Sequence, residues 1–229
     1  TRPTAAWPSV RMSMIVSTIV RMTTSVAPKP RARSLRKVES NNIVRLFLGL
    51  AIMDFRHQIS LPGALADQAV DALVLVVCGD AVDAALDARL AAALKDAVTH
   101  GDLVLKSGKA LYLHRPVGVK AARLVFAVAA AASAKAFKAA VAQGMALVKG
   151  TGAKHVAVAL AGAGSLGADH AEALVAACAE ATYLYRHTKP SAPAASALGK
   201  VTLLCAKADA KAVQQGLVLG QAIAEGVTL

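Results

Sequence analysis

Residues 72–78 read Ala-Leu-Val-Leu-Val-Val-Cys, an apolar run without a polar interruption. A strand with one wet face alternates apolar and polar residues, whereas a continuous apolar run is typical of a strand covered on both faces. The segments 123–129 and 155–160 have the same character after their first residue. These strands predict a sheet with helices on both sides, which is the α/β class.

Segments with helical periodicity lie between these runs. Leu86, Leu90 and Leu94 recur every four residues, which places them on one face of a helix. A second helix follows Ser133, a residue type suited to cap it, and turns Phe137, Val141 and Met145 inward. We expect strands at 54–61, 72–78, 103–105, 110–114, 123–129, 155–160 and 200–206, and helices at 83–98, 133–149, 169–186 and 208–225.

This alternation predicts a three-layer α/β sandwich with a mixed sheet, compatible with a macro-domain-like arrangement. Periodicity alone does not separate that arrangement from other three-layer folds. Asp169 and Glu172 resemble a capping box at the start of the third helix. Gly226 follows the last helical run and is a usual stop signal.

Basic charge is concentrated in residues 1–52, which carry nine Lys or Arg and one acid, Glu39, out of a total net charge of +12. No apolar period persists there, so we expect a disordered basic leader. It has three readings: upstream sequence translated before a true start at Met53, an Arg-rich organelle transit peptide, or a basic arm that touches nucleic acid. The remaining chain is interpreted as a domain at 53–206 and a final helix at 207–229.

The three cysteines each lie inside an apolar segment and have no metal-ligand spacing, which favours buried, reduced thiols in a cytoplasmic protein. They are Cys78, Cys178 and Cys205. The longest apolar run, 124–134, is about half of the roughly 20 residues that a membrane-spanning helix needs. We therefore expect no membrane association.

The sharpest local motif is the run from Gly162 through Gly164 to Gly167, which fits the G-x-G-x-x-G pattern between a strand and a helix. Backbone amides there could cradle a phosphate at the helix N-terminus. No strand ending in an acid follows about 20 residues on, as dinucleotide binding requires. The alternative interpretation is a flexible loop whose helix is capped by Asp169.

Other chemistry-bearing residues are scattered. The six histidines show no pairing with metal-ligand spacing, so we expect no metal site within this chain. Acids before and on the first long helix are interpreted as a solvated face that compensates the dipole of the helix N-terminus: Asp80, Asp83 and Asp87. A basic cluster surrounds the predicted paired strands, as a solvated face or a weak nucleic-acid patch: Lys106, Lys109, Arg115, Lys120 and Arg123.

Three segments carry a family resemblance, by their order and spacing. Residues 111–114 (Leu-Tyr-Leu-His) with Arg123 and the strand after it resemble a strand pair of the leucine (cytosol) aminopeptidase family. Residues 183–189, with Tyr183, Tyr185 and Lys189, are similar to a helix end of that family. Residues 219–229 resemble its linker helix. The chain departs from the family at 128–131, where Val-Ala-Ala-Ala stands in place of a glycine-containing strand end.

The resemblance implies a non-catalytic N-terminal domain with a macro-like fold, joined by 207–229 to a missing C-terminal peptidase domain. The parent would be a hexameric, cytoplasmic metallopeptidase that removes N-terminal residues from peptides with two zinc or manganese ions. None of the family's metal motifs occurs here, so the resemblance implies no catalytic and no metal-binding residue in this chain.

Two alternatives remain: a free-standing macro-like module that binds ADP-ribose or nucleic acid, and a DNA-binding protein with a basic arm. The last helix is expected to expose an apolar face, Val213, Leu217 and Ile223, toward the missing domain, which predicts marginal stability or self-association.

Overall fold

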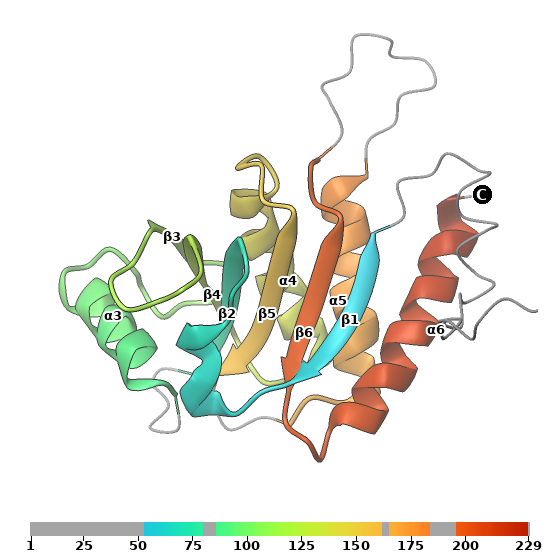
Figure 1. The fold of residues 1–229 in the computed structure, drawn as a ribbon, viewed down its shortest axis with the longest axis horizontal. Coiled ribbons are helices and arrows are strands. Elements are labelled where there is room, and N and C mark those ends of the chain that lie inside the picture. Colours follow the sequence, from blue (N-terminus) through green and yellow to red (C-terminus); the bar gives the residue numbers. More distant parts are fainter. Residues whose placement is uncertain (1–52, 80–85, 162–164, 184–195, 229) are drawn as a thin grey trace, which may run out of the picture. The chain divides into compact units, whose positions relative to one another are not determined.

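The computed structural model describes residues 53–79, 86–161, 165–183 and 196–228, and in them a six-stranded sheet with the order β1-β6-β5-β2-β4-β3 (Figure 1). Strand β3 runs antiparallel to β4, and the other pairs are parallel, so the predicted mixed sheet is confirmed. The strands are β1 (Asp54–Ile59), β2 (Ala72–Cys78), β3 (Ala110–His114), β4 (Arg123–Ala129), β5 (His155–Ala161) and β6 (Lys200–Cys205). The helices are the 3-10 helix η1 (Pro62–Asp67) and the α-helices α3 (Ala88–Thr99), α4 (Ala134–Val148), α5 (Ala168–Thr182) and α6 (Ala210–Thr228).

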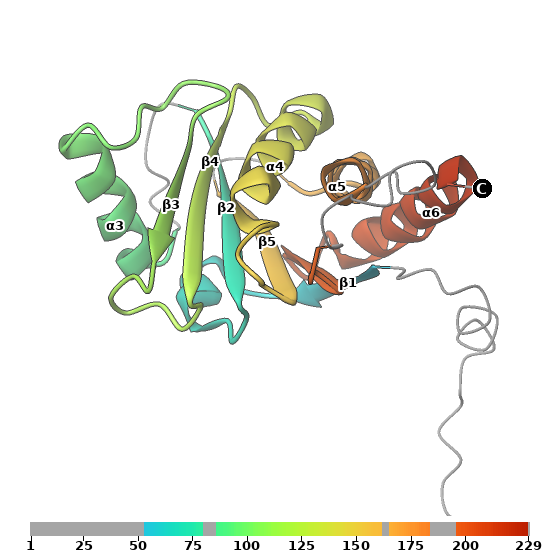
Figure 2. The ribbon, with the colours of Figure 1, turned by 90° about the horizontal axis from the view of Figure 1, so that it is seen from above.

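The helices form two layers on either side of the sheet. Helix α3 covers one face, and α4, α5 and α6 cover the other (Figure 2). Strand β2 lies between them, and its alternate side chains enter two separate clusters: Val74 and Val76 face α4 and α5, while Leu73 and Leu75 face α3. Both sets are fully buried, which explains why the strand contains no polar residue and confirms the three-layer sandwich.

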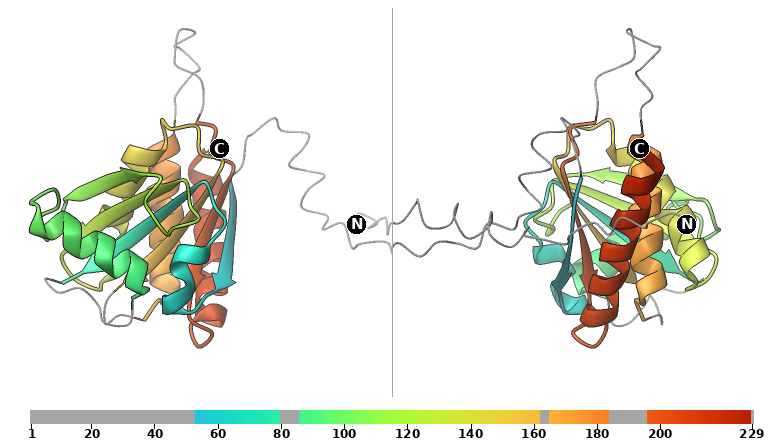
Figure 3. Two further views of the ribbon diagram at one scale, coloured as in Figure 1. Left: turned by 60° about the vertical axis from the view of Figure 1, so that its left-hand side comes forward. Right: turned by 90° about the vertical axis from the view of Figure 1, so that its right-hand side faces the viewer.

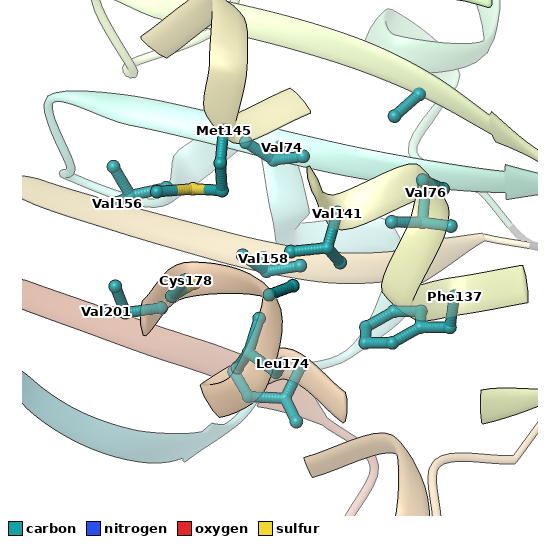
Figure 4. Packing of buried hydrophobic residues seen from close by; sticks show 14 of the residues in the cluster. Val74, Val76, Phe137, Val141, Met145, Val156, Val158, Leu174, Cys178 and Val201 are labelled. Carbon is teal, nitrogen blue, oxygen red and sulfur yellow. The ribbon is translucent and has the colours of Figure 1, made fainter. Parts of the chain in front are cut away.

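The larger cluster is built from Val, Leu and Ala because the domain has few aromatic residues (Figure 4). Phe137, Val141 and Met145 of α4 all point into it, as their spacing predicts, and Ser133 caps α4 by accepting a hydrogen bond from the Ala136 amide at 3.4 Å. Helix α4 approaches β2 so closely that a Cβ at Gly144 would lie 2.6 Å from a Val74 methyl group.

Helix α6 packs along α5, and Figure 3 shows the two side by side. Gly216 and Gly220 allow this approach: a Cβ at Gly216 would lie 2.7 Å from the Ala168 carbonyl carbon, and one at Gly220 would lie 3.1 Å from the Glu172 Cα. Val213 and Leu217 are buried in the core cluster, so the expectation that they form an exposed face was wrong. Of the three residues named for that face, only Ile223 is exposed.

Helix and strand ends differ from the sequence predictions in several places. Helix α6 continues through Gly226 to Thr228, because Gly226 does not adopt the left-handed conformation by which a glycine ends a helix. Helix α5 has Gly167 as its N-cap, so the predicted Asp169–Glu172 capping box was wrong. Strand β1 ends at Ile59, since η1 follows within three residues.

No strand forms at 103–105, so that prediction was wrong. Leu103 is buried and its amide donates to the Ala97 carbonyl at 3.1 Å, which ties the segment to the end of α3. The pairing partner of β3 is β4.

The predicted helix at 83–98 begins later, at Ala88, and residues 83–85 lie outside the described parts. Asp87 is its N-cap and is only 4% exposed. The predicted place of Asp87 at the helix N-terminus is confirmed, but its place on a solvated face was wrong. Asp80 and Asp83 lie outside the described residues.

Candidate functional site

The start of α5 is the place where sequence reasoning located a phosphate cradle. Gly162 and Gly164 lie outside the described residues, and Gly167 caps the helix in an extended backbone conformation. The Leu166 amide donates to Asp209 Oδ2 at 3.1 Å, and the Gly167 amide donates to His170 Nδ1 at 3.3 Å. Two amides that a phosphate would need are thus engaged by side chains of this domain.

His170 joins this helix start to the segment that follows β4. Its Nε2 donates to the Ala132 carbonyl at 3.1 Å, and its ring lies edge-on to Phe137 with centroids 5.5 Å apart. Because Nδ1 accepts from Gly167 and Nε2 faces a carbonyl, this arrangement requires the neutral ring with its proton on Nε2. We infer from this that His170 holds the start of α5 against the segment that follows β4. The sequence pattern did not indicate this role.

Much of the predicted basic cluster is engaged within the domain. Arg123 is half-buried and donates from its guanidinium to the Thr151 carbonyl at 2.9 Å. Lys120 forms an ion pair with Asp67 at 3.4 Å. Lys106, Lys109 and Arg115 are exposed. The structure therefore brings together fewer free cations at this edge than the sequence count suggests.

A second ion network was not foreseen from sequence. Arg89 bridges Asp87 and Asp67 at 2.9 and 2.8 Å and donates to the Gly118 carbonyl at 3.1 Å. These hydrogen bonds hold the pKa of both carboxyl groups below its usual value. The network joins η1, the start of α3 and the loop before β4, and thus positions the α3 layer.

A polar pair lies at the amino-terminal edge of the parallel strands. His155 Nε2 lies 2.9 Å from Thr202 Oγ1, and Asp71 accepts the amides of Lys154 and His155 at 2.9 and 3.0 Å. These amides lower the pKa of the Asp71 carboxyl, while burial and nearby Lys200 lower that of His155. Because Asp71, His155 and Thr202 each have a hydrogen-bond partner within the domain, we infer that they have a structural role.

A groove of about 800 Å³ lies over α5, between the start of α4 and the end of α6. Its floor is made of small residues of α5: Ala173, Ala176 and Ala179. Ile223 and Val227 of α6 form one wall, and they are 54% and 81% exposed. The remaining lining residues are Ala134, Lys135, Lys138, Asp169, Glu172, Glu180, Tyr183, Gly220 and Ala224.

Within the described parts of the chain, no group of three or more His, Cys, Asp or Glu residues is placed to hold a metal ion. No helix in those parts is long and apolar enough to cross a membrane. Cys178 and Cys205 are buried and Cys78 is partly buried. Burial raises the pKa of the Cys178 thiol to about 12, so it is protonated at neutral pH.

Comparison with known proteins gives a consistent result. Residues 66–191 match the sequence model described as "Cytosol aminopeptidase family, N-terminal domain". A probable cytosol aminopeptidase of Methylibium petroleiphilum is 55% identical over 177 residues, which are 77% of this chain and 36% of that protein. One of Polaromonas sp. strain JS666 is 34% identical over 137 residues, 60% of this chain and 27% of that protein. A mutant of tomato leucine aminopeptidase is a structural neighbour with a TM-score of 0.60 at 18% identity, covering 78% of this chain and 37% of its own.

The fold is thus of the type found in leucine aminopeptidase, an α/β domain with a mixed sheet. The chain belongs to the cytosol aminopeptidase family, and residues 66–191 are its N-terminal domain. The family resemblance seen in the sequence is confirmed. The chain spans about a third of the length of the curated relatives it matches.

Proposed function

We propose that this chain is the non-catalytic part of a leucyl aminopeptidase, with a role in assembly or regulation of the parent enzyme. The match of 66–191 to the family's N-terminal domain carries the proposal. The two-thirds of the Methylibium protein outside the matched segment would supply the peptidase domain. Residues 207–229 would be the linker to that domain, and residues 53–206 the domain proper.

The parent would remove N-terminal residues from peptides by two-metal hydrolysis, with zinc or manganese held outside this chain, as a cytoplasmic hexamer. In such a centre, two cations activate water and polarise the scissile carbonyl. The names of the relatives, each a probable cytosol aminopeptidase, support the reaction class. In this proposal, residues 1–229 contribute no group to that chemistry.

The decisive experiment compares two proteins with leucine p-nitroanilide and Mn²⁺. The first is this chain, which should show no hydrolysis above buffer. The second is this chain completed with the unmatched C-terminal portion of the Methylibium protein, which should hydrolyse the substrate. Hydrolysis by residues 1–229 alone, removed by a chelator, would contradict the proposed division of labour.

Nucleic-acid binding has a separate test, because the basic charge is concentrated in residues 1–52. If that segment is the source, DNA affinity measured by fluorescence anisotropy should vanish when the chain starts at Met53. Binding that survives the deletion would instead point to the exposed cations Lys106, Lys109 and Arg115. Binding of ADP-ribose, measured by calorimetry on the chain from Met53, would favour the free-standing module.

A further inference from the structure

One flank of α6 is apolar and open. Leu219, Ile223 and Val227 follow one another at four-residue intervals, so they lie on the same side of the helix. They are 51%, 54% and 81% exposed. The adjoining side of α6, roughly 100° around the helix axis, is buried through Val213 and Leu217. Helix α6 therefore carries two apolar faces, and among the described residues only one of them packs against this domain.

The open flank continues into the groove over α5. Ile223 and Val227 form its wall, and the alanines of α5 form a floor without bulky side chains. Small floor residues let the backbone or side chains of another segment approach closely. Extended exposed apolar surface of this kind marks an interaction site on soluble domains.

We propose that the groove is the docking site for the polypeptide that follows residue 229 in full-length relatives, an inference that rests on the proposed function. The wall of the groove is the last part of α6, so a chain continuing from α6 leaves from the rim of the groove itself. Under the proposed function, the unmatched part of the relatives is that continuation, since this chain covers 36% and 27% of their lengths.

The size of the groove favours this occupant over a second copy of the chain. Fourteen residues line it, whereas a stable interface between separate proteins uses about 20–30 residues a side. A tethered segment meets the groove at an effective concentration in the millimolar range, so a small surface is sufficient. The site would fix the direction in which the next domain leaves this one.

Thiol labelling tests the proposal. Ala176→Cys places a reporter on the groove floor, and Ala92→Cys places a control on an exposed position of α3, on the opposite layer. Each variant is made in residues 1–229 and in the chain completed from the Methylibium protein. Labelling with a maleimide is followed at each site by peptide mass spectrometry, and protection of the buried Cys178 verifies that the protein is folded.

We expect Cys at 176 to react at least tenfold more slowly in the completed chain than in residues 1–229, with equal rates at 92. Equal rates at 176 would overturn the proposal, as would concentration-dependent protection of 176 in residues 1–229, which would indicate a second copy. Ile223→Cys on the wall is a second reporter for the same outcomes.

The measurements distinguish a failure of the docking site from a failure of the proposed enzyme function. A completed chain that hydrolyses leucine p-nitroanilide while position 176 stays reactive refutes the docking site alone. Protection of 176 without hydrolysis refutes the proposed enzyme alone.

Discussion

Replacing Gly216 by alanine should separate α6 from α5. The added Cβ would lie 2.7 Å from both the carbonyl carbon and the Cα of Ala168, and real Cβ atoms essentially never come closer than 3.0 Å to another atom. The obstructing atoms are backbone, so no side-chain rotation relieves the contact. The helices must move apart, which loosens the packing of Val213 and Leu217 in the core.

The expected magnitude combines two opposing terms. Overpacking of this kind costs typically 1–3 kcal/mol, and more where backbone must shift. Alanine gains about 1 kcal/mol over glycine in a helix interior. Because the contact is with backbone, the cost of overpacking should be about 3 kcal/mol or more. After the gain from alanine, we expect the free energy of unfolding to fall by about 2 kcal/mol. For a domain of this size, that lowers Tm by roughly 4–8 °C.

The assay is urea unfolding of residues 53–229 followed by circular dichroism, with thermal unfolding as a second readout. Gly226→Ala in the same helix is the matched control, because nothing lies within 4 Å of its added Cβ. It should leave stability unchanged or raise it by up to about 1 kcal/mol. If both variants gained stability equally, the close crossing of α5 and α6 would be refuted.

Three further changes follow from the ion and polar contacts and from the packing of α6. Asp87→Ala removes the α3 N-cap and a partner of Arg89, and should cost about 1–3 kcal/mol in urea unfolding. Burial lowers the folded-state pKa of His155, so its contribution is complete above about pH 6.5 and is lost as pH falls from there toward the folded pKa. His155→Gln should therefore flatten the pH dependence of Tm between pH 7 and 5; an unchanged slope would exclude His155 as its source. Truncation after residue 209 removes α6 and should abolish the cooperative unfolding transition; a chain that still melts sharply would show that α6 is dispensable.

The sheet was largely predictable, because strands that are covered on both faces consist of apolar residues and can be recognised by that composition. A run such as 72–78 can only be covered on both faces, and the structure buries residues 72–77 and partly buries Cys78. The segment 103–105 shows the limit of this reasoning. Leu103 is as apolar as a strand residue, but its amide bonds to the end of α3, and no local pattern encodes that contact.

The surroundings of the glycine loop could not be predicted for a related reason. The partners of its amides are His170, which is near in sequence, and Asp209, which is 43 residues away from Leu166. Arg89 likewise meets Asp67 across 22 residues and Gly118 across 29. Sequence spacing finds sites built within one element, whereas these contacts exist only once the layers have packed.

Helix α6 shows how one element can serve two neighbours. Its glycines and its buried face hold it on α5, so its direction is fixed by this domain. In the proposed docking, its open flank and the adjoining groove would then face the occupant in a fixed direction. A linker helix that moved freely relative to this domain would not need close backbone contact with it. The close approach at Gly216 and Gly220 therefore indicates that α6 is fixed on α5. In the proposed docking, this fixed helix with its second apolar flank would set the orientation of the polypeptide that occupies the groove.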